Sequence, residues 1–159
     1  MIELELVGVR VELPHNQPIV LLKESSGERF LPIWIGAVEA TAIAFALQGV
    51  ETARPMTHDL MKDLLDALTV SVDRIVVTEL RDGTYYAEIQ MEGPAGEAVV
   101  SSRTSDAIAL AVRGGIPVFA EEAVLEEAGI LIDDADESET EVETFKEFLD
   151  TVTPEDFAQ

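Results

Sequence analysis

Two short segments combine an arginine, a hydroxyl residue and an aspartate in an order that suits the start of a helix. They are Arg54-Pro55-Met56-Thr57-His58-Asp59 and Arg103-Thr104-Ser105-Asp106. In each, Thr57 or Ser105 is expected at the N-cap, and the aspartate is expected in the first turn, near the positive end of the helix dipole. Arginine and carboxylate groups together can bind phosphate and cations, so both segments are candidates for a functional site.

The same pattern supports a structural interpretation and a functional one. In the structural interpretation, each segment is a capped helix with an Arg–Asp ion pair. In the functional one, the two helix starts lie side by side and form a single site for a phosphate and a metal. The metal ligands would then be Glu39, Asp59 and Asp106. The residues expected to bind the substrate phosphate are Arg54, Arg103 and Ser105.

His58 and Glu39 each have two interpretations. His58 is either a hydrogen-bonded structural residue or a proton donor or acceptor, and in the second case it forms the catalytic set with Asp59 and Asp106. Glu39 falls in the first turn of the most apolar helix of the sequence, where a buried carboxylate needs a partner. That partner is either a metal or an arginine, from Arg54 or Arg103.

The composition limits which metal could be bound. The sequence has no cysteine and two histidines, which excludes thiolate zinc sites and a histidine-rich cage. Carboxylate oxygens favour hard cations, so Mg²⁺ or Mn²⁺ is the expected cofactor.

The charge of the chain works against binding to nucleic acid. The formal net charge is −22, and the residues from Asp133 onward carry −10 of it, with 11 acids and one lysine. Most nucleic-acid-binding proteins gain affinity from lysine and arginine contacts to phosphate, and at the level of net charge this chain lacks them. The acidic tail would instead suit a basic partner.

Periodicity predicts an α+β fold, with an antiparallel or mixed sheet of meander and hairpin strands packed by three to four helices. The expected strands are residues 2–13, 19–23, 29–35, 70–80, 84–91, 98–101 and 116–120. The expected helices are residues 36–48, 57–68, 105–113 and 121–128, with a further amphipathic helix at 141–149 in the acidic tail.

Local sequence signals add detail to the predictions for several of these elements. A change of alternation at Val7-Gly8 predicts a bulge in the first strand, and Asp82-Gly83 predicts a tight hairpin. Pro32 cannot donate to a sheet, so the third strand is expected at an edge or with a bulge. The second helix is expected to bury one apolar stripe. This stripe consists of Leu60, Met61, Leu64, Leu65 and Leu68.

The chain is expected to divide into a folded domain at 1–132 and an acidic linker with a short helix at 133–159. No apolar segment is long enough for a membrane span, and the N-terminus has no signal-like pattern. The cytoplasm is therefore the expected compartment, without contact to a membrane.

Three blocks of sequence resemble the bifunctional nuclease domain (BFN domain, DUF151). They are Leu31-Pro32-Ile33-Trp34-Ile35-Gly36 with Glu39-Ala40, then Arg54 to Leu60, then Ser105 to Ala111. The resemblance covers residues 1–132 and implies nuclease activity on DNA and RNA. The chain departs from similar members at Ser101 and Thr104, where an acid and a proline are usual.

Two functions are therefore weighed. The first is a metal-dependent nuclease that hydrolyses phosphodiester bonds, in which carboxylates hold the cation and arginine stabilises the developing charge. The alternative is a non-catalytic binding or regulatory domain whose Arg and Asp residues are structural. A homo-oligomer is expected in either case, because an apolar helix and an edge strand offer contact surfaces.

Overall fold

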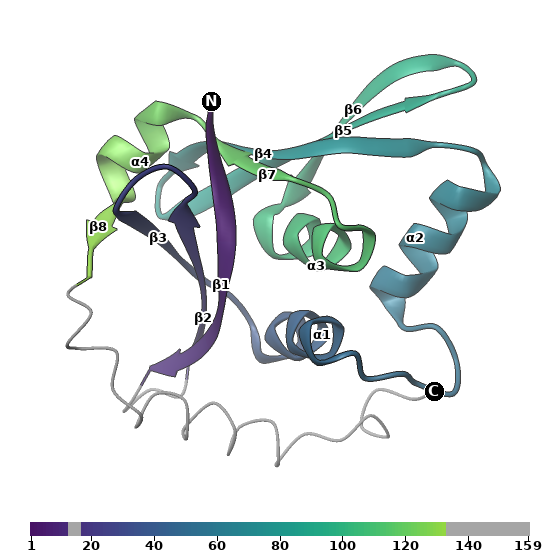
Figure 1. Cartoon of the computed structure of the whole chain (residues 1–159), viewed down its shortest axis with the longest axis horizontal. Helices are drawn as coiled ribbons and strands as arrows, with labels where there is room; N and C mark the ends of the chain where they lie inside the picture. Colours follow the sequence, from purple (N-terminus) through teal and green to yellow (C-terminus); the bar gives the residue numbers. More distant parts are fainter. Residues whose placement is uncertain (13–16, 133–159) are drawn as a thin grey trace.

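The computed structural model describes residues 1–12 and 17–132, which form a mixed sheet with four helices (Figure 1). The predicted α+β class is confirmed. The strands are β1 (Ile2–Glu12), β2 (Gln17–Glu24), β3 (Arg29–Trp34), β4 (Ser71–Arg81), β5 (Thr84–Gly93), β6 (Gly96–Arg103), β7 (Val118–Ala120) and β8 (Ile130–Leu131). The helices are α1 (Ala37–Gln48), α2 (Thr57–Ala67), α3 (Thr104–Gly114) and α4 (Glu122–Ala128).

All described strands belong to one sheet in the order β6-β5-β4-β7-β1-β2-β3-β8. Neighbouring strands are antiparallel except β4 and β7, which are parallel. The sheet curls strongly: β5 and β3 are far apart in the strand order, yet the Tyr85 hydroxyl on β5 donates a hydrogen bond of 3.2 Å to the Pro32 carbonyl on β3. Helix α4 contacts both β3 and β4. The curl therefore brings the end of β3 close to the tip of the β4–β5 hairpin.

The local sequence signals are confirmed in the strands. β1 pairs Leu6 with Leu22 and then Gly8 with Leu21, so Val7 is the extra residue of a bulge. Asp82 and Gly83 have φ angles of 51° and 77°, as a tight hairpin turn between two twisted strands requires.

Pro32 lies on an open part of the sheet edge, as predicted. It pairs with Leu21 of β2 without a change of register. On the other side of β3, the two-residue strand β8 pairs only with Arg29 and Phe30. The nitrogen of Pro32 therefore leaves no ladder hydrogen bond unmade.

Helix α3 is the central helix of the fold. Figure 1 shows it between α1 and the strands β4 and β7, with α2 on its other side. Its small residues Ala107, Ala109 and Ala111 are almost fully buried, which allows neighbouring elements to approach closely. Two apolar clusters meet at this helix, because Ile108 packs toward β1–β3 and Leu110 packs toward β4 and β5. The backbone at the start of α3 is consequently fixed by packing against both apolar clusters.

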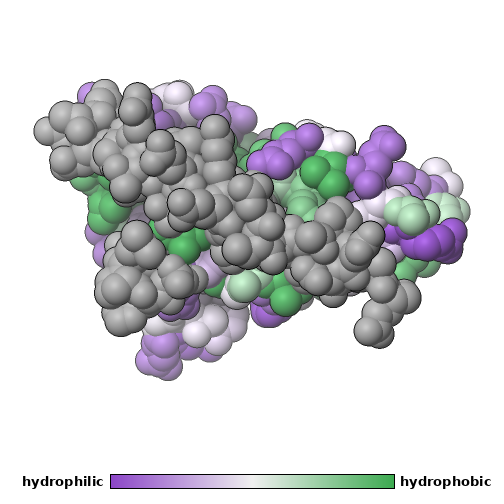
Figure 2. Space-filling model, turned by 90° about the horizontal axis from the view of Figure 1, so that it is seen from below, coloured by the Kyte–Doolittle hydropathy of each residue, from purple (hydrophilic) through white to green (hydrophobic). Residues whose placement is uncertain are grey.

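The apolar stripe predicted for α2 is correct for only two of its five members. Met61 and Leu65 pack against the cluster beside α3, whereas Leu60, Leu64 and Leu68 are 51–66% exposed. The packing side of α2 is set by buried His58, which lies on the same side as Met61 and Leu65 and turns the other leucines outward. Figure 2 shows hydrophobic residues among hydrophilic ones on the coloured part of the lower face.

The helix predicted at 141–149 and the domain boundary at 132/133 lie outside the described residues or at their limit, so both stay predictions. Within residues 1–12 and 17–132, no helix has the length and apolar character to cross a membrane.

Candidate functional site

An open pocket lies where the curled sheet meets the start of α3. It has a volume of about 250 Å³. Three segments form its wall: the end of β3 with the following residues up to Glu39, the hairpin residues Gly83–Tyr85, and the start of α3 at 103–105. The pocket is therefore built from three parts of the sequence that only the tertiary fold brings together.

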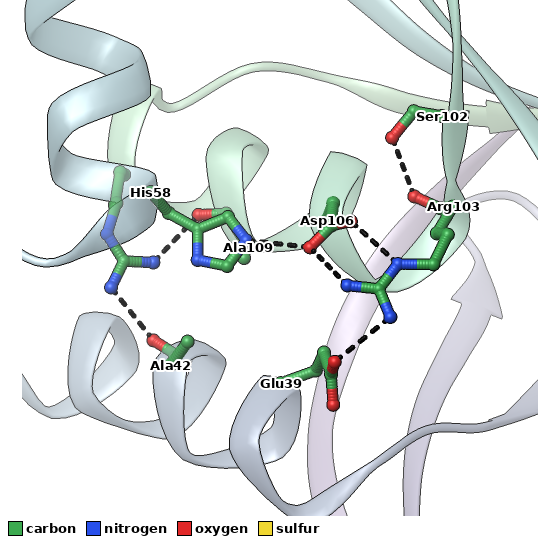
Figure 3. Close-up of polar contacts among 8 residues, drawn as sticks. Glu39, Ala42, His58, Ser102, Arg103, Asp106 and Ala109 are labelled. Atoms are coloured by element: carbon green, nitrogen blue, oxygen red, sulfur yellow. Dashed lines mark hydrogen bonds and ion pairs between the residues drawn. The ribbon is translucent and has the colours of Figure 1, made fainter. Parts of the chain in front are cut away.

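Arg103 is the centre of the polar contacts at this pocket. Its Nε lies 2.8 Å from Asp106 Oδ2, one terminal nitrogen lies 3.1 Å from Asp106 Oδ1, and the other lies 3.0 Å from Glu39 Oε1. Figure 3 shows Arg103 between Asp106 on α3 and Glu39 on α1. The Arg103 side chain is still 65% exposed. Since a guanidinium has five N–H donors and three are used here, two can bind another group.

His58 lies on the other side of Asp106 from Arg103 (Figure 3). Its Nε2 is 2.9 Å from Asp106 Oδ1, and the residue is only 6% exposed. His58 does not line the pocket. Its contact with the pocket side of the cluster is therefore indirect and passes through the Asp106 carboxylate.

Asp59 belongs to a second ion pair, with an arginine that the sequence did not suggest. Arg113 Nε lies 2.7 Å from Asp59 Oδ1, and its terminal nitrogens donate to the Ala109 and Ala42 carbonyls at 3.0 and 3.1 Å. The Arg113 side chain is only 9% exposed. This arginine thus ties α2, α3 and α1 together beneath the surface.

Both aspartates are kept ionised by their partners. Partial burial raises the pKa of Asp106, but hydrogen bonds from Arg103 and His58 outweigh this effect and leave the pKa below its usual value. For Asp59 the same balance holds, with burial opposed by hydrogen bonds from Arg113 and the Met56 N–H, so its pKa is also lowered. An ionised Asp106 is an acceptor, so His58 Nε2 is the donor in their hydrogen bond.

The N-cap positions differ from the prediction. Helix α2 begins at Thr57 with Met56 as N-cap, and α3 begins at Thr104 with Arg103 as N-cap. In α2, the carboxylate of Asp59 accepts a hydrogen bond of 3.0 Å from the Met56 N–H. A side chain in the first turn therefore does the capping that was expected of the threonine hydroxyl.

The structure brings together four of the sequence-predicted site residues: Glu39, His58, Arg103 and Asp106. Ser105 is buried and lines the same pocket. Asp59 is next to His58 but faces Arg113. Arg54 is exposed, and its backbone carbonyl accepts a hydrogen bond from the Thr52 hydroxyl.

Four residues at or near the site were missed from the sequence: Trp34, Tyr85, Thr104 and Arg113. Trp34, Tyr85 and Thr104 line the pocket. Within the described residues, the Thr104 hydroxyl is the buried side-chain oxygen that has no hydrogen-bond partner. The position of Arg113 in the last turn of α3 carries no signal for a partner that lies 54 residues away.

The carboxylates form a pair rather than the expected set of three. In the part of the chain that the structure describes, no group of three or more Asp, Glu or His side chains is arranged to hold a metal ion. Glu39 and Asp106 are drawn together by Arg103, while Asp59 is bound to Arg113. Mg²⁺ typically takes one or two protein carboxylates and completes its shell with water and substrate phosphate. By donor chemistry, Glu39 and Asp106 fit such a cation.

A family model described as the bifunctional nuclease domain matches residues 20–133. The match begins in β2 and contains every residue of the pocket and of both ion-pair groups.

Curated proteins of two kinds are similar to this chain. An uncharacterized protein of Mycobacterium tuberculosis is 51% identical over 162 residues, which cover 98% of this chain and 97% of that protein. Bifunctional nuclease 1 of Arabidopsis thaliana is 32% identical over 109 residues, which cover 66% of this chain and 33% of the plant protein. Bifunctional nuclease 2 of the same plant is 29% identical over 108 residues, with 66% and 32% coverage. The similarity to proteins named as nucleases is thus limited to one part of each plant chain.

Proposed function

This chain belongs to the bifunctional nuclease domain family, and we propose from this premise that it hydrolyses phosphodiester bonds of DNA or RNA at the pocket beside Arg103. One observation is the main support for placing the active site at this pocket. Arg103 is held in place by Asp106 and Glu39, yet its side chain is 65% exposed at an open pocket. A fixed, exposed arginine is suited to bind a phosphate and to stabilise charge that develops on it.

Arg103 binds the phosphate through the two N–H groups that the carboxylates leave unused. Asp106 holds Nε and one terminal nitrogen of the guanidinium, which fixes its plane. The position of the donors is therefore set before the substrate arrives, and little side-chain ordering is needed in the transition state.

Glu39 and Asp106 would hold a divalent cation, Mg²⁺ or Mn²⁺, next to this phosphate. When bound there, such a cation would supply neutralising charge and Lewis acidity to the reaction. It also reverses the negative sign of the local field, which matters in a chain with a net charge of −22.

His58 acts in this proposal as a positioning residue. It donates a hydrogen bond to Asp106 from a nearly buried site and keeps the carboxylate turned toward Arg103. Asp59 has a different role, because with Arg113 it fixes α2 against α3 and so fixes the position of His58.

A non-catalytic binding domain is the second candidate, and the pairing of the acids favours it. Glu39, Asp59 and Asp106 each accept from an arginine, and the pKa of both aspartates is lowered, as in a purely structural network. The negative charge of the chain would also weaken its encounter with a phosphate backbone.

A cleavage assay separates the two candidates. The full chain is incubated at low salt with end-labelled DNA and RNA in Mg²⁺, in Mn²⁺ and in excess chelator. The proposal predicts cleavage with a divalent cation, its loss in chelator, and a decrease of about 100-fold or more in Asp106→Asn. If the parent cuts nothing under any of these conditions, the binding-domain candidate is favoured. If Asp106→Asn melts like the parent and cuts at the parental rate, the assigned site is wrong.

A further inference from the structure

The pocket at Arg103 contains two aromatic residues that phosphate binding does not use. Trp34 lines it from the end of β3 and is 50% exposed, although it is a large apolar residue. Tyr85 lines it from β5 and is half-buried, with its hydroxyl bonded to the Pro32 carbonyl. Burial raises the pKa of Tyr85, so this hydroxyl keeps the proton that it donates. The lining of the pocket therefore includes two aromatic side chains, of which Tyr85 is held in place by its hydrogen bond.

We propose that this pocket binds one unpaired nucleotide, with its base against Trp34 and its phosphate against Arg103. The inference rests on the proposed nuclease function and adds its substrate class, single-stranded nucleic acid. A base can stack on an aromatic side chain whatever its sequence, with a gain of about 1–3 kcal/mol per base. In a duplex, both faces of each base are already covered by neighbouring bases.

The polar side of the pocket offers groups for the phosphate or sugar. Arg103 has two N–H donors that are not bound to carboxylates. Thr104 lines the same pocket and is 3% exposed, and its hydroxyl has no partner within the described residues. A buried hydroxyl without a partner costs about 1–3 kcal/mol. The oxygen itself is closed off from solvent, so Arg103 is the group that meets the phosphate.

The size of the pocket agrees with one nucleotide. Its volume of about 250 Å³ lies just below the range of roughly 300–1,000 Å³ that is typical for drug-sized ligands. A single base with its flanking phosphate can occupy such a space, whereas a double helix can only lie across its opening.

Trp34 is the only tryptophan of the chain, so intrinsic fluorescence reports directly on the pocket. The full chain is titrated in Mg²⁺ with a short oligothymidylate, with a blunt duplex of equal length and with inorganic phosphate. A gel after each titration checks that the oligomers are intact. The oligothymidylate is expected to quench the fluorescence, and the duplex and phosphate are expected to leave it unchanged. Equal quenching by the duplex would overturn the inference.

A labelled oligothymidylate then measures affinity for variants by fluorescence anisotropy. Trp34→Leu is expected to weaken binding by about 5- to 150-fold, which is the loss of one stacked base. Trp34→Phe keeps an aromatic face and is expected to recover most of that loss. Phe119→Leu on β7, outside this pocket, is the control and is expected to bind like the parent. Unchanged binding in a folded Trp34→Leu variant would contradict the inference.

Failure of this inference and failure of the proposed function give different results. If the parent cleaves single strands and duplexes equally and Trp34→Leu does the same with an unchanged KM, the stacking pocket is wrong and the nuclease stands. If oligothymidylate quenches Trp34 but no cation supports cleavage, the pocket stands and the nuclease is wrong.

Discussion

The starts of α2 and α3 carry the same combination of arginine, hydroxyl residue and aspartate, but their aspartates bind very different arginines. Asp59 at the start of α2 binds Arg113, whose side chain is 9% exposed and makes three hydrogen bonds inside the fold. Asp106 at the start of α3 binds Arg103, whose side chain is 65% exposed at a pocket. One motif holds helices together, and the other leaves an arginine exposed at a pocket.

The exposure of the paired arginine, rather than the aspartate itself, therefore distinguishes the buried ion pair from the one at the pocket. Arg113 makes three hydrogen bonds, as Arg103 does, but its side chain is only 9% exposed, so it presents little surface to a ligand and cannot leave its place without a large cost. An exposed arginine held by two carboxylates keeps donors for another group. His58 connects the two motifs, since it directly precedes Asp59 on α2 and bonds to Asp106 on α3.

Removal of the buried arginine, Arg113, is expected to have the largest effect on stability. Arg113→Met is predicted to lower the free energy of unfolding by about 2–4 kcal/mol, because it leaves Asp59 without its main partner and α1, α2 and α3 without their shared contact. Urea unfolding at pH 7 measures the loss. Arg81→Met, at an arginine that is 60% exposed and paired with Glu79, is the matched control and should change stability little. A loss below about 1 kcal/mol in Arg113→Met would show that the buried pair does not hold the helices.

The pH dependence of the stability loss in Arg113→Met is expected to be a smaller effect, and its direction follows from the pKa of Asp59. The pKa of Asp59 is lowered in the folded chain, despite partial burial, by hydrogen bonds from Arg113 and the Met56 N–H. Such stabilisation is present above the unfolded pKa of about 3.9 and is lost as the pH falls through the folded pKa. The difference in stability between the parent and Arg113→Met should therefore narrow from pH 7 to pH 3. A stability difference that stays constant or grows as the pH falls would contradict the pairing of Asp59 with Arg113.

The smallest effect is expected at the unpaired hydroxyl beside the exposed arginine. Thr104→Val removes an oxygen that has no partner in the described residues, so stability should stay equal or rise by up to about 1 kcal/mol. Thr41→Val is the matched control, because its buried hydroxyl donates to the Ala37 carbonyl at 2.8 Å and its removal should cost about 1 kcal/mol. Thermal unfolding of both variants compares them. A clear loss of stability in Thr104→Val would mean that its hydroxyl is already satisfied in the folded chain.

Features that depend only on residues adjacent in the sequence could be predicted. The bulge at Val7-Gly8 and the hairpin at Asp82-Gly83 follow from local alternation and turn chemistry, and both are in the structure. β6 was expected only at residues 98–101 but covers Gly96–Arg103, since most of its residues are exposed and give little alternation. β8 was not expected, because a two-residue strand exists only through its pairing with β3.

The site was predictable in its residue types but not in its pairings. Glu39, His58, Arg103 and Asp106 stood out because charged residues at helix starts need partners. The choice of Arg113 for Asp59 depends on how α2 packs against α3, which also decides that Leu60 and Leu64 face outward. Trp34 meets the pocket only because the sheet curls, and no local pattern encodes this.

The exposed arginine gives the most direct test of the central claim. The rate of cleavage of labelled single-stranded DNA and RNA is measured at low salt in Mg²⁺ and Mn²⁺ for the parent, Arg103→Gln and Arg74→Gln. Both variants lose one positive charge, but Arg74 lies outside the pocket and bonds to Gln90 on β5. We expect Arg103→Gln to unfold within about 1 kcal/mol of the parent and to cleave about 100-fold more slowly. We expect Arg74→Gln to cleave at close to the parental rate. Equal rates for a folded Arg103→Gln and the parent would contradict the assignment of the site.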